Sequence, residues 1–211
     1  MSELLTVTAR DGLKLEGRLD EPAAPGGALV LCHPHPKMGG TMNAPLLDAL
    51  TDELVGRGWA VLRFNFRGIG VSEGTSGTGV DEVADAIGAL DAARARYNLP
   101  LGIAGWSFGG AVALRAAVED GGLDACCLIA PAMNEKPGVT AGLPSPDGLG
   151  FRSPVLVTCG ANDDQVDPAA CADWATRAGA KYVEIPAANH FFWVKYDKLV
   201  VVVGDFLDAF L

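Results

Sequence analysis

Two periodicities of apolar residues divide this chain into short strands and longer helices. Short apolar runs predict strands at residues 28–32, 59–65, 101–104, 124–130 and 154–159, and a further strand is predicted at 181–185. The continuous run at residues 28–32 predicts a strand that is buried on both faces. Apolar residues spaced three and four apart predict helices at residues 44–57, 80–97, 111–117, 169–178 and 196–210. Strands that alternate with helices predict a parallel, doubly wound sheet with right-handed crossovers.

The two ends of this pattern differ from its middle. Residues 4–10 and 13–19 alternate between apolar and polar and are joined at Asp11-Gly12, which predicts an antiparallel hairpin. Residues 131–153 are rich in proline and glycine, and we expect this irregular segment to be the part of the chain able to act as a lid. Residues 1–211 are therefore expected to form one α/β domain without a separate cap domain.

Composition limits the kinds of partner that this protein is expected to bind and the cellular compartment in which it is expected to lie. Hydrophobic residues make up 49% and charged residues 20% of the chain, as in globular proteins. The net charge of -10 disfavours nucleic acid or an anionic membrane as a partner. The N-terminus lacks the pattern of a secretion signal, and the five cysteines form no C-x-x-C pair. We therefore expect a cytoplasmic protein whose cysteines are reduced core residues.

The candidate nucleophile is Ser107, at the centre of the sequence Gly-Trp-Ser-Phe-Gly at residues 105–109. The strand predicted at residues 101–104 leads into this sequence, and the helix predicted at 111–117 follows it. A G-x-S-x-G turn between a strand and a helix holds the serine in a strained conformation and exposes its hydroxyl. The helix N-terminus also offers free N–H groups to a developing negative charge. The alternative is a turn that only joins the two elements.

A serine hydroxyl needs a base, and the chain has only three histidines. Hydrolases with this turn carry serine, acid and histidine in that order along the chain, which selects His190 over His33 and His35. The alternative for His190 is a histidine that only packs beneath the aromatic residues following it. His33 and His35 are expected to support their loop rather than to exchange protons.

The acid that would orient His190 is less clearly defined by the sequence. Asp163, Asp164 and Asp167 all follow the strand predicted at residues 154–159, and Glu135 follows the preceding strand. Each lies after the carboxyl end of a predicted strand, where ligands bind in open α/β sheets. The residues alone therefore leave the choice open.

Four motifs in order along nearly the whole chain resemble a compact, capless branch of the α/β-hydrolase superfamily. They are HPHP at residues 33–36 with GGT at 39–41, FNFRGIGVSEG at 64–74, GWSFGG at 105–110 and NHFF at 189–192. That family has a G-x-x-D-x-x-V pattern after its penultimate strand, and residues 160–166 match it with Asp163 as the acid. The resemblance thus ranks Asp163 first, Asp164 second and Glu135 third.

The resemblance also implies an oxyanion hole and the walls of a pocket. One donor would be the N–H of Phe108, which follows the nucleophile. The other would come from the loop after the strand at residues 28–32, and His35 is selected because Pro34 and Pro36 have no N–H. Aromatic and apolar residues near these positions are the candidate substrate-binding residues, namely Trp106, Met133, Phe191 and Trp193.

The function expected from these residues is a serine hydrolase, specifically a carboxylesterase that acts on small or short-acyl esters through an acyl-enzyme at Ser107. Thioesterase, amidase or lactonase activity on the same residues remains open, as does a non-catalytic binding protein of this fold. Dehalogenases and epoxide hydrolases of this fold use an aspartate nucleophile, so Ser107 argues against them. The expected partner is a small-molecule ester, and the choice between monomer and homodimer stays open.

No cofactor or metal is expected. His33 and His35 lie beside Cys32 but have no further cluster of ligands to complete a metal site. The loop at residues 68–74 fails the dinucleotide fingerprint because Glu73 occupies its third glycine position. We expect that loop to support the site, with Arg67 paired to an internal carboxylate.

Overall fold

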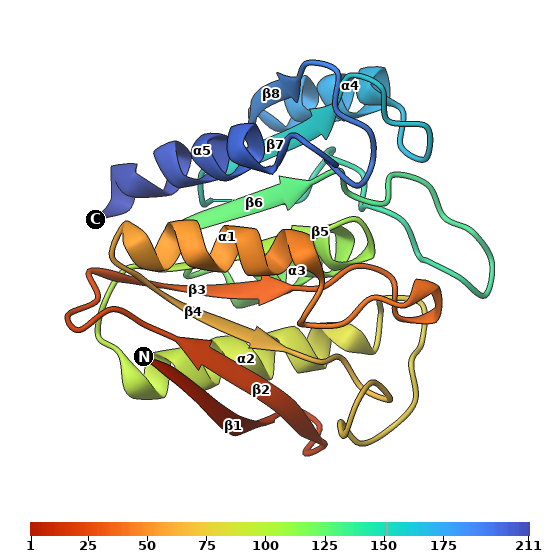
Figure 1. The fold of residues 1–211 in the computed structure, drawn as a ribbon. Helices are drawn as coiled ribbons and strands as arrows, with labels where there is room; N and C mark the ends of the chain where they lie inside the picture. Colours follow the sequence, from red (N-terminus) through yellow and green to blue (C-terminus); the bar gives the residue numbers. More distant parts are fainter. Residues whose placement is uncertain (151) are drawn as a thin grey trace.

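The computed structural model describes residues 1–150 and 152–211, and it contains one eight-stranded sheet in the order β1-β2-β4-β3-β5-β6-β7-β8 (Figure 1). The strands are β1 (Ser2–Thr8), β2 (Lys14–Asp20), β3 (Gly27–Cys32), β4 (Trp59–Phe64), β5 (Leu101–Trp106), β6 (Ala125–Ile129), β7 (Val155–Gly160) and β8 (Lys181–Ile185). Strands β3 to β8 run parallel, and the β1–β2 hairpin joins β4 antiparallel. The predicted hairpin and parallel sheet are therefore confirmed.

Helices cover both faces of the sheet. They are α1 (Pro45–Gly56), α2 (Glu82–Arg96), α3 (Phe108–Asp120), α4 (Pro168–Ala178) and α5 (Tyr196–Leu207), with short 3-10 helices at Pro36–Met38 (η1) and Asp208–Phe210 (η2). In Figure 1, α1 and α5 lie side by side on the near face, while α2 and α3 pack together on the far face. Helix α4 packs against β7 and β8. The apolar periodicity did not predict η1.

The centre of the sheet is buried on both faces. Every residue of β3, β4, β5, β6 and β7 is buried, as their continuous apolar runs predict. Strand β2 instead alternates between buried and partly exposed residues because only one of its faces meets the core. None of the helices in residues 1–150 and 152–211 is long and apolar enough to cross a membrane.

The strand order brings distant loops to one edge of the sheet. The segments after β3, β5, β7 and β8 all leave at the carboxyl ends of parallel strands, on the right of Figure 1. Residues 131–153, the segment expected to be irregular, leave from the same edge and form one isolated bridge between Lys136 and Thr140. Phe151, within that segment, lies outside the described residues. This edge carries the candidate active site.

Candidate active site

Ser107 alone separates β5 from α3, and its backbone lies in the region that L residues rarely adopt. Its φ of 56° and ψ of -115° make a sharp reversal, which its N–H stabilises by donating to the carbonyl of Ile129 at 2.8 Å. Strand and helix then pass so closely that a Cβ on Gly105 would lie 2.1 Å from the carbonyl oxygen of Gly109. Only glycine at position 105 therefore permits this turn, which lifts the Ser107 hydroxyl clear of the sheet.

The structure brings Ser107, His190 and Asp163 into one hydrogen-bonded chain. The hydroxyl Oγ of Ser107 lies 3.1 Å from Nε2 of His190, and Nδ1 of His190 lies 2.9 Å from Oδ2 of Asp163. The His190 and Asp163 side chains are only 4% and 0% exposed. Because an ionised carboxylate only accepts, Nδ1–H donates to Asp163, and Nε2 is free to accept the Ser107 proton.

Asp163 is held by more than His190. Its other oxygen, Oδ1, accepts the backbone N–H groups of Gln165 at 2.9 Å and Val166 at 2.8 Å. Burial raises the pKa of Asp163, but hydrogen bonding and charge from His190, together with these N–H groups, outweigh burial and hold the pKa below its ordinary value. The carboxylate therefore stays ionised and fixed in orientation at neutral pH.

The other two candidate acids lie elsewhere. Asp164 and Glu135 are both exposed, and neither makes a hydrogen bond or ion pair to His190 among the described residues. Asp167 caps the N-terminus of α4, where its carboxylate accepts the N–H of Ala169 at 2.9 Å. Contact with His190 thus distinguishes Asp163 from its neighbours.

The segment that carries His190 is held against the ends of β5 and β7. The indole Nε1–H of Trp106 donates to the carbonyl of His190 at 3.2 Å. A Cβ on Gly160, at the end of β7, would lie 2.4 Å from the carbonyl oxygen of Ala188, so glycine is required for the loop to pass there. These contacts fix the imidazole above Ser107.

The loop after β3 is ordered by His33, which is fully buried. Its Nε2 accepts the backbone N–H of Phe66 at 3.0 Å, so Nδ1 carries the proton and donates to the carbonyl of Pro34 at 2.7 Å. That carbonyl belongs to the same trans peptide unit as the His35 N–H, which must point in the opposite direction. Burial lowers the pKa of His33 to about 4, which keeps the ring neutral.

Both nitrogens of the His35 ring also form hydrogen bonds with backbone groups. Its Nδ1 accepts the N–H of Lys37 at 3.1 Å, and its Nε2–H donates to the carbonyl of Val139 at 3.1 Å. The ring packs against that of Phe108, with 4.9 Å between centroids. Among the described residues, neither the His35 nor the Phe108 backbone N–H has a protein acceptor. One of these free donors lies on the loop after β3 and the other on the first residue of α3, directly after Ser107, and backbone N–H groups of this kind form oxyanion holes.

Two cavities of unequal size meet at Ser107. The larger has a volume of about 320 Å³ and is lined by the loop at residues 34–45, Trp106 and Phe191. The smaller has a volume of about 80 Å³ and is lined by Phe108, Met133 and other residues of the 132–140 segment. Gln165 borders both cavities, and the sequence did not identify it as a site residue. Gln165 lies inside the G-x-x-D-x-x-V pattern, two residues after Asp163, and this nearness to the candidate acid is the feature of the sequence that could have pointed to it.

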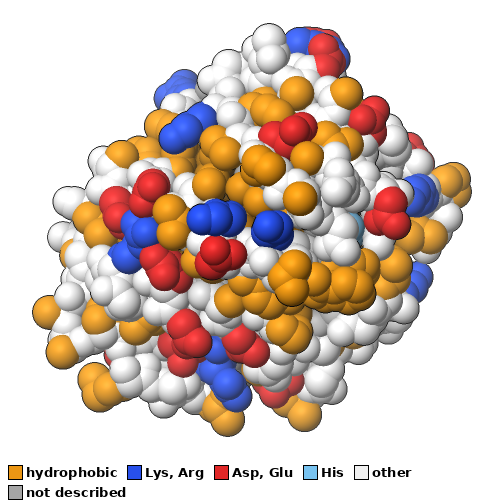
Figure 2. All heavy atoms as spheres, turned by 45° about the horizontal axis from the view of Figure 1, so that its top comes forward, with side chains coloured by type: hydrophobic (Ala, Val, Ile, Leu, Met, Phe, Trp, Pro, Cys, Tyr) orange, Lys and Arg blue, Asp and Glu red, His pale blue; other side chains and the backbone are white. Residues whose placement is uncertain are grey.

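The predicted substrate-binding residues divide between these cavities and the surface. Trp106 and Phe191 line the larger cavity, and Met133 lines the smaller one. Trp193 lines neither cavity: it is 60% exposed and stacks on Phe191 with ring centroids 4.9 Å apart. Charged and apolar side chains are intermixed on the face shown in Figure 2, where only a trace of histidine is visible because all three histidines are buried.

The loop at residues 64–74 supports the site from below. Its Arg67 forms an ion pair with Asp85 at 2.7 Å, in which the Asp85 side chain is 0% exposed, and this confirms the predicted internal carboxylate. Asn65 accepts the N–H of Met42 at 2.8 Å and so ties the end of β4 to the loop after β3. The loop thus has a structural role beside the candidate oxyanion donors.

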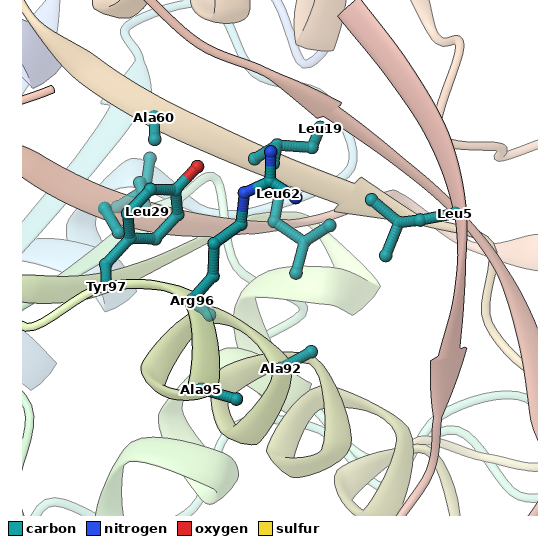
Figure 3. A pocket seen from close by; sticks show the side chains of 11 residues that line it. Leu5, Leu19, Leu29, Ala60, Leu62, Ala92, Ala95, Arg96 and Tyr97 are labelled. Atoms are coloured by element: carbon teal, nitrogen blue, oxygen red, sulfur yellow. The ribbon is translucent and has the colours of Figure 1, made fainter. Parts of the chain in front are cut away.

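A further cavity of about 360 Å³ lies at the opposite, amino edge of the strands. Figure 3 shows Arg96 and Tyr97, from the end of α2, over apolar side chains of the sheet such as Leu29 and Leu62. Arg96 is paired with Glu21 at 3.0 Å. The residues that line this cavity include no nucleophile with a base beside it, so the candidate chemistry resides at the Ser107 edge.

Comparison with known proteins agrees with this arrangement. The family model described as serine aminopeptidase, S33 (Hydrolase_4) matches residues 23–149, which is more than half of the chain. The chain belongs to this family of α/β hydrolases. Over 207 residues the hydrolase is 30% identical to the uncharacterized protein RP471 of Rickettsia prowazekii (strain Madrid E), a match that covers 92% of this chain and 84% of that protein.

Solved structures extend the likeness to the whole fold of this hydrolase. XC6422 from Xanthomonas campestris, an α/β serine hydrolase without a lid, superposes with a TM-score of 0.86 at 29% identity over 100% of this chain and 95% of its own. The Pyrococcus furiosus esterase Pf2001 superposes with a TM-score of 0.82 at 19% identity over 100% and 93% of the two chains, a likeness of fold alone. The predicted superfamily and capless architecture are confirmed.

Proposed function

We propose that this hydrolase is a carboxylesterase that cleaves small esters through an acyl-enzyme at Ser107. The observation that carries the proposal is the continuous chain of hydrogen bonds from Ser107 through His190 to Asp163, with distances of 3.1 and 2.9 Å. A serine hydroxyl becomes a competent nucleophile only beside a base that can take its proton. The strained turn at Ser107 adds support, because backbone strain of this kind is maintained at functional sites.

The proposed reaction has two steps. Ser107 Oγ attacks the ester carbonyl while Nε2 of His190 takes the hydroxyl proton, and the resulting oxyanion accepts the N–H groups of His35 and Phe108. The C–O bond to the alcohol breaks as His190 returns the proton to the leaving oxygen, which leaves an acyl-serine. Water, deprotonated by His190, then attacks the acyl-serine. The C–O bond to Ser107 breaks as His190 returns the proton to Oγ, which releases the acid and restores the free serine. Asp163 orients the imidazole and stabilises its charged form in both steps.

The cavities indicate the size of the substrate. An ester carbonyl bound at Ser107 carries its acyl and alkoxy groups toward two hollows, of about 320 and 80 Å³. The smaller hollow suits a group of a few carbon atoms, while the larger one suits a longer apolar or aromatic group beside Trp106 and Phe191. An ester with one short substituent is therefore the proposed substrate class.

A second candidate function is the hydrolysis of amides. The matched family model is described as serine aminopeptidase, and amide hydrolysis uses the same nucleophile, base and oxyanion donors. The two functions differ in the leaving group, because an amine must be protonated as it departs. Matched p-nitrophenyl ester and p-nitroanilide substrates with the same acyl group separate them.

The first test is labelling with a fluorophosphonate at neutral pH, followed by peptide mass spectrometry. We expect modification at Ser107 that is lost in His190→Ala, together with hydrolysis of p-nitrophenyl acetate at rates well above those of the anilide. Ser107→Ala should lower kcat by about 10⁴-fold or more while leaving the melting temperature nearly unchanged. A folded protein that neither labels nor hydrolyses any ester would refute the proposal and favour a binding role.

A further inference from the structure

Cys159 lies at the end of β7, directly beneath the carboxylate of Asp163. Its sulfur is 3.6 Å from Oδ2 of Asp163, the same oxygen that accepts Nδ1–H of His190. The Cys159 residue is fully buried. Distances near 3.6 Å are ordinary for a thiol hydrogen bond, since sulfur is larger than oxygen. Oδ2 therefore has two side-chain partners, the imidazole of His190 and the thiol of Cys159.

The thiol is the donor in this contact. The neighbouring Cys171 thiol, burial and the negative charge of Asp163 all raise the pKa of Cys159, so its sulfur keeps its proton at neutral pH. An ionised carboxylate has no proton to give and is a stronger acceptor than another thiol. The Cys159 S–H is consequently directed at Oδ2.

We propose that Cys159 is a positioning residue, whose S–H bond to Asp163 fixes the carboxylate and limits its hold on the His190 proton. The proposal rests on the proposed esterase function, because it assigns Cys159 a role in the same chain of hydrogen bonds. Oδ1 is already held by two backbone N–H groups. The thiol supplies the remaining bond, to the oxygen that faces the imidazole.

The direction of the effect follows from competition for Oδ2. A donor on a carboxylate oxygen withdraws negative charge that would otherwise attract the imidazolium. Without the thiol, Oδ2 holds the protonated imidazole more tightly, and the base is freed only at higher pH. The other titratable groups near Cys159 are Cys171 on α4 and Tyr182 and Glu184 on β8. Among the described residues none of these three side chains hydrogen-bonds to Asp163, and the Tyr182 hydroxyl donates to Pro168 and Glu184 instead, so none replaces the donor.

The other buried cysteines provide matched controls. Cys32 on β3 and Cys126 and Cys127 on β6 lie in the same sheet and are also fully buried, and β6 is the neighbour of β7. Within the described residues, none of these three contacts the Asp163 carboxylate. Replacing Cys127 by alanine should therefore reproduce the loss of packing in the sheet without touching the hydrogen bonds of the site.

The experiment compares Cys159→Ala, Cys159→Val and Cys159→Ser with the wild type and with Cys127→Ala. The first readout is the pH dependence of kcat/KM for p-nitrophenyl acetate, which reports the free enzyme's essential base. Alanine and valine differ in volume but both remove the donor, so both should move the midpoint of the acid limb upward by about half a pH unit. Serine restores a donor and should return the midpoint toward the wild-type value, while Cys127→Ala should leave it unchanged.

A second readout does not depend on turnover. The proton on Nδ1 of His190, bonded to a carboxylate, is observable by NMR as a resonance far downfield, and a stronger bond to Oδ2 should move it further downfield in Cys159→Ala and Cys159→Val. If the wild type hydrolyses no ester, the esterase proposal fails while this resonance still tests the thiol.

Two results overturn the proposal. In one, folded Cys159→Ala and Cys159→Val keep the wild-type midpoint and the wild-type resonance, so that the thiol only packs. In the other, Cys127→Ala produces the same shifts, so that they report loosening of the sheet rather than loss of the donor.

Discussion

Acidification should unfold this protein in large part through His33. This imidazole is fully exposed to solvent in the unfolded chain but fully buried in the fold, between the end of β4 and the loop after β3. Its Nε2 accepts the Phe66 N–H, so protonating that nitrogen would both place a charge in the core and break the hydrogen bond. The folded state therefore resists a proton that the unfolded chain accepts readily.

The magnitude follows from the two pKa values. Burial lowers the pKa of His33 from 6.5 to about 4, so between these values the unfolded chain binds more protons than the fold does. The free energy of unfolding contributed by the neutral ring is fully present above pH 6.5 and declines as the pH falls. The expected loss is about 2 kcal/mol by pH 5 and about 3 kcal/mol by pH 4.

Urea denaturation at pH 7, 6, 5 and 4 measures this loss, with His33→Gln as the comparison. The glutamine amide can offer both a donor and an acceptor but cannot bind a proton in this range. His33→Gln should be less stable than the wild type at pH 7, and the gap between them should narrow by about 3 kcal/mol at pH 4. All carboxylates titrate in both proteins, so the difference between the two curves isolates His33.

A constant gap would refute this reasoning. If the wild type and His33→Gln lose stability in parallel from pH 7 to pH 4, the proton must enter the fold at His33 without cost, and the burial argument fails. The same outcome would remove the reason given for the fixed orientation of the peptide between Pro34 and His35.

Further substitutions test the site and its scaffold. In steady-state assays, Asp163→Asn should lower kcat/KM for p-nitrophenyl acetate by about 10⁴-fold, whereas Asp164→Asn, at an exposed position, should change kcat/KM by no more than about twofold. Equal losses in the two variants would contradict the assignment of Asp163 as the acid that orients His190. Gly109→Ala places a Cβ 2.4 Å from a backbone carbonyl oxygen, so thermal denaturation should show a loss of about 3 kcal/mol or more; an unchanged melting temperature would argue against the close approach. Arg67→Met leaves the buried Asp85 carboxylate without its ion-pair partner, so urea denaturation should show a loss of about 3–5 kcal/mol in the free energy of unfolding. Adding Asp85→Leu removes the unpaired charge and should recover most of that loss.

The sequence by itself determined the architecture and pointed to the candidate nucleophile. Apolar periodicity reports which faces of each local element are buried, and burial is what a strand or helix must satisfy wherever it lies. The alternation of elements then requires a parallel sheet, and the glycine-flanked Ser107 has a steric reason to sit in a sharp turn. With only three histidines in the chain, their order left His190 as the base to expect.

Tertiary structure decided the choices between neighbouring residues. Asp163 and Asp164 are adjacent carboxylates, and the turn that directs two N–H groups at Oδ1 of Asp163 is what aims its Oδ2 at His190. Trp193 and Phe191 are two residues apart, yet only Phe191 lines a cavity. Phe192, between them, has a φ of 54°, so the backbone turns there and sends the two side chains in different directions, and periodicity averaged over a loop carries no such information.

The Cys159 thiol, beside Asp163, shows most clearly what the sequence alone does not determine. In the sequence, Cys159 is one more apolar residue of a buried strand, like Cys126 and Cys127. Its contact with the carboxylate depends on where β7 ends and on how the following turn folds back over the strand. Local composition therefore specifies that a side chain is buried, and the packing of distant segments specifies what it meets there.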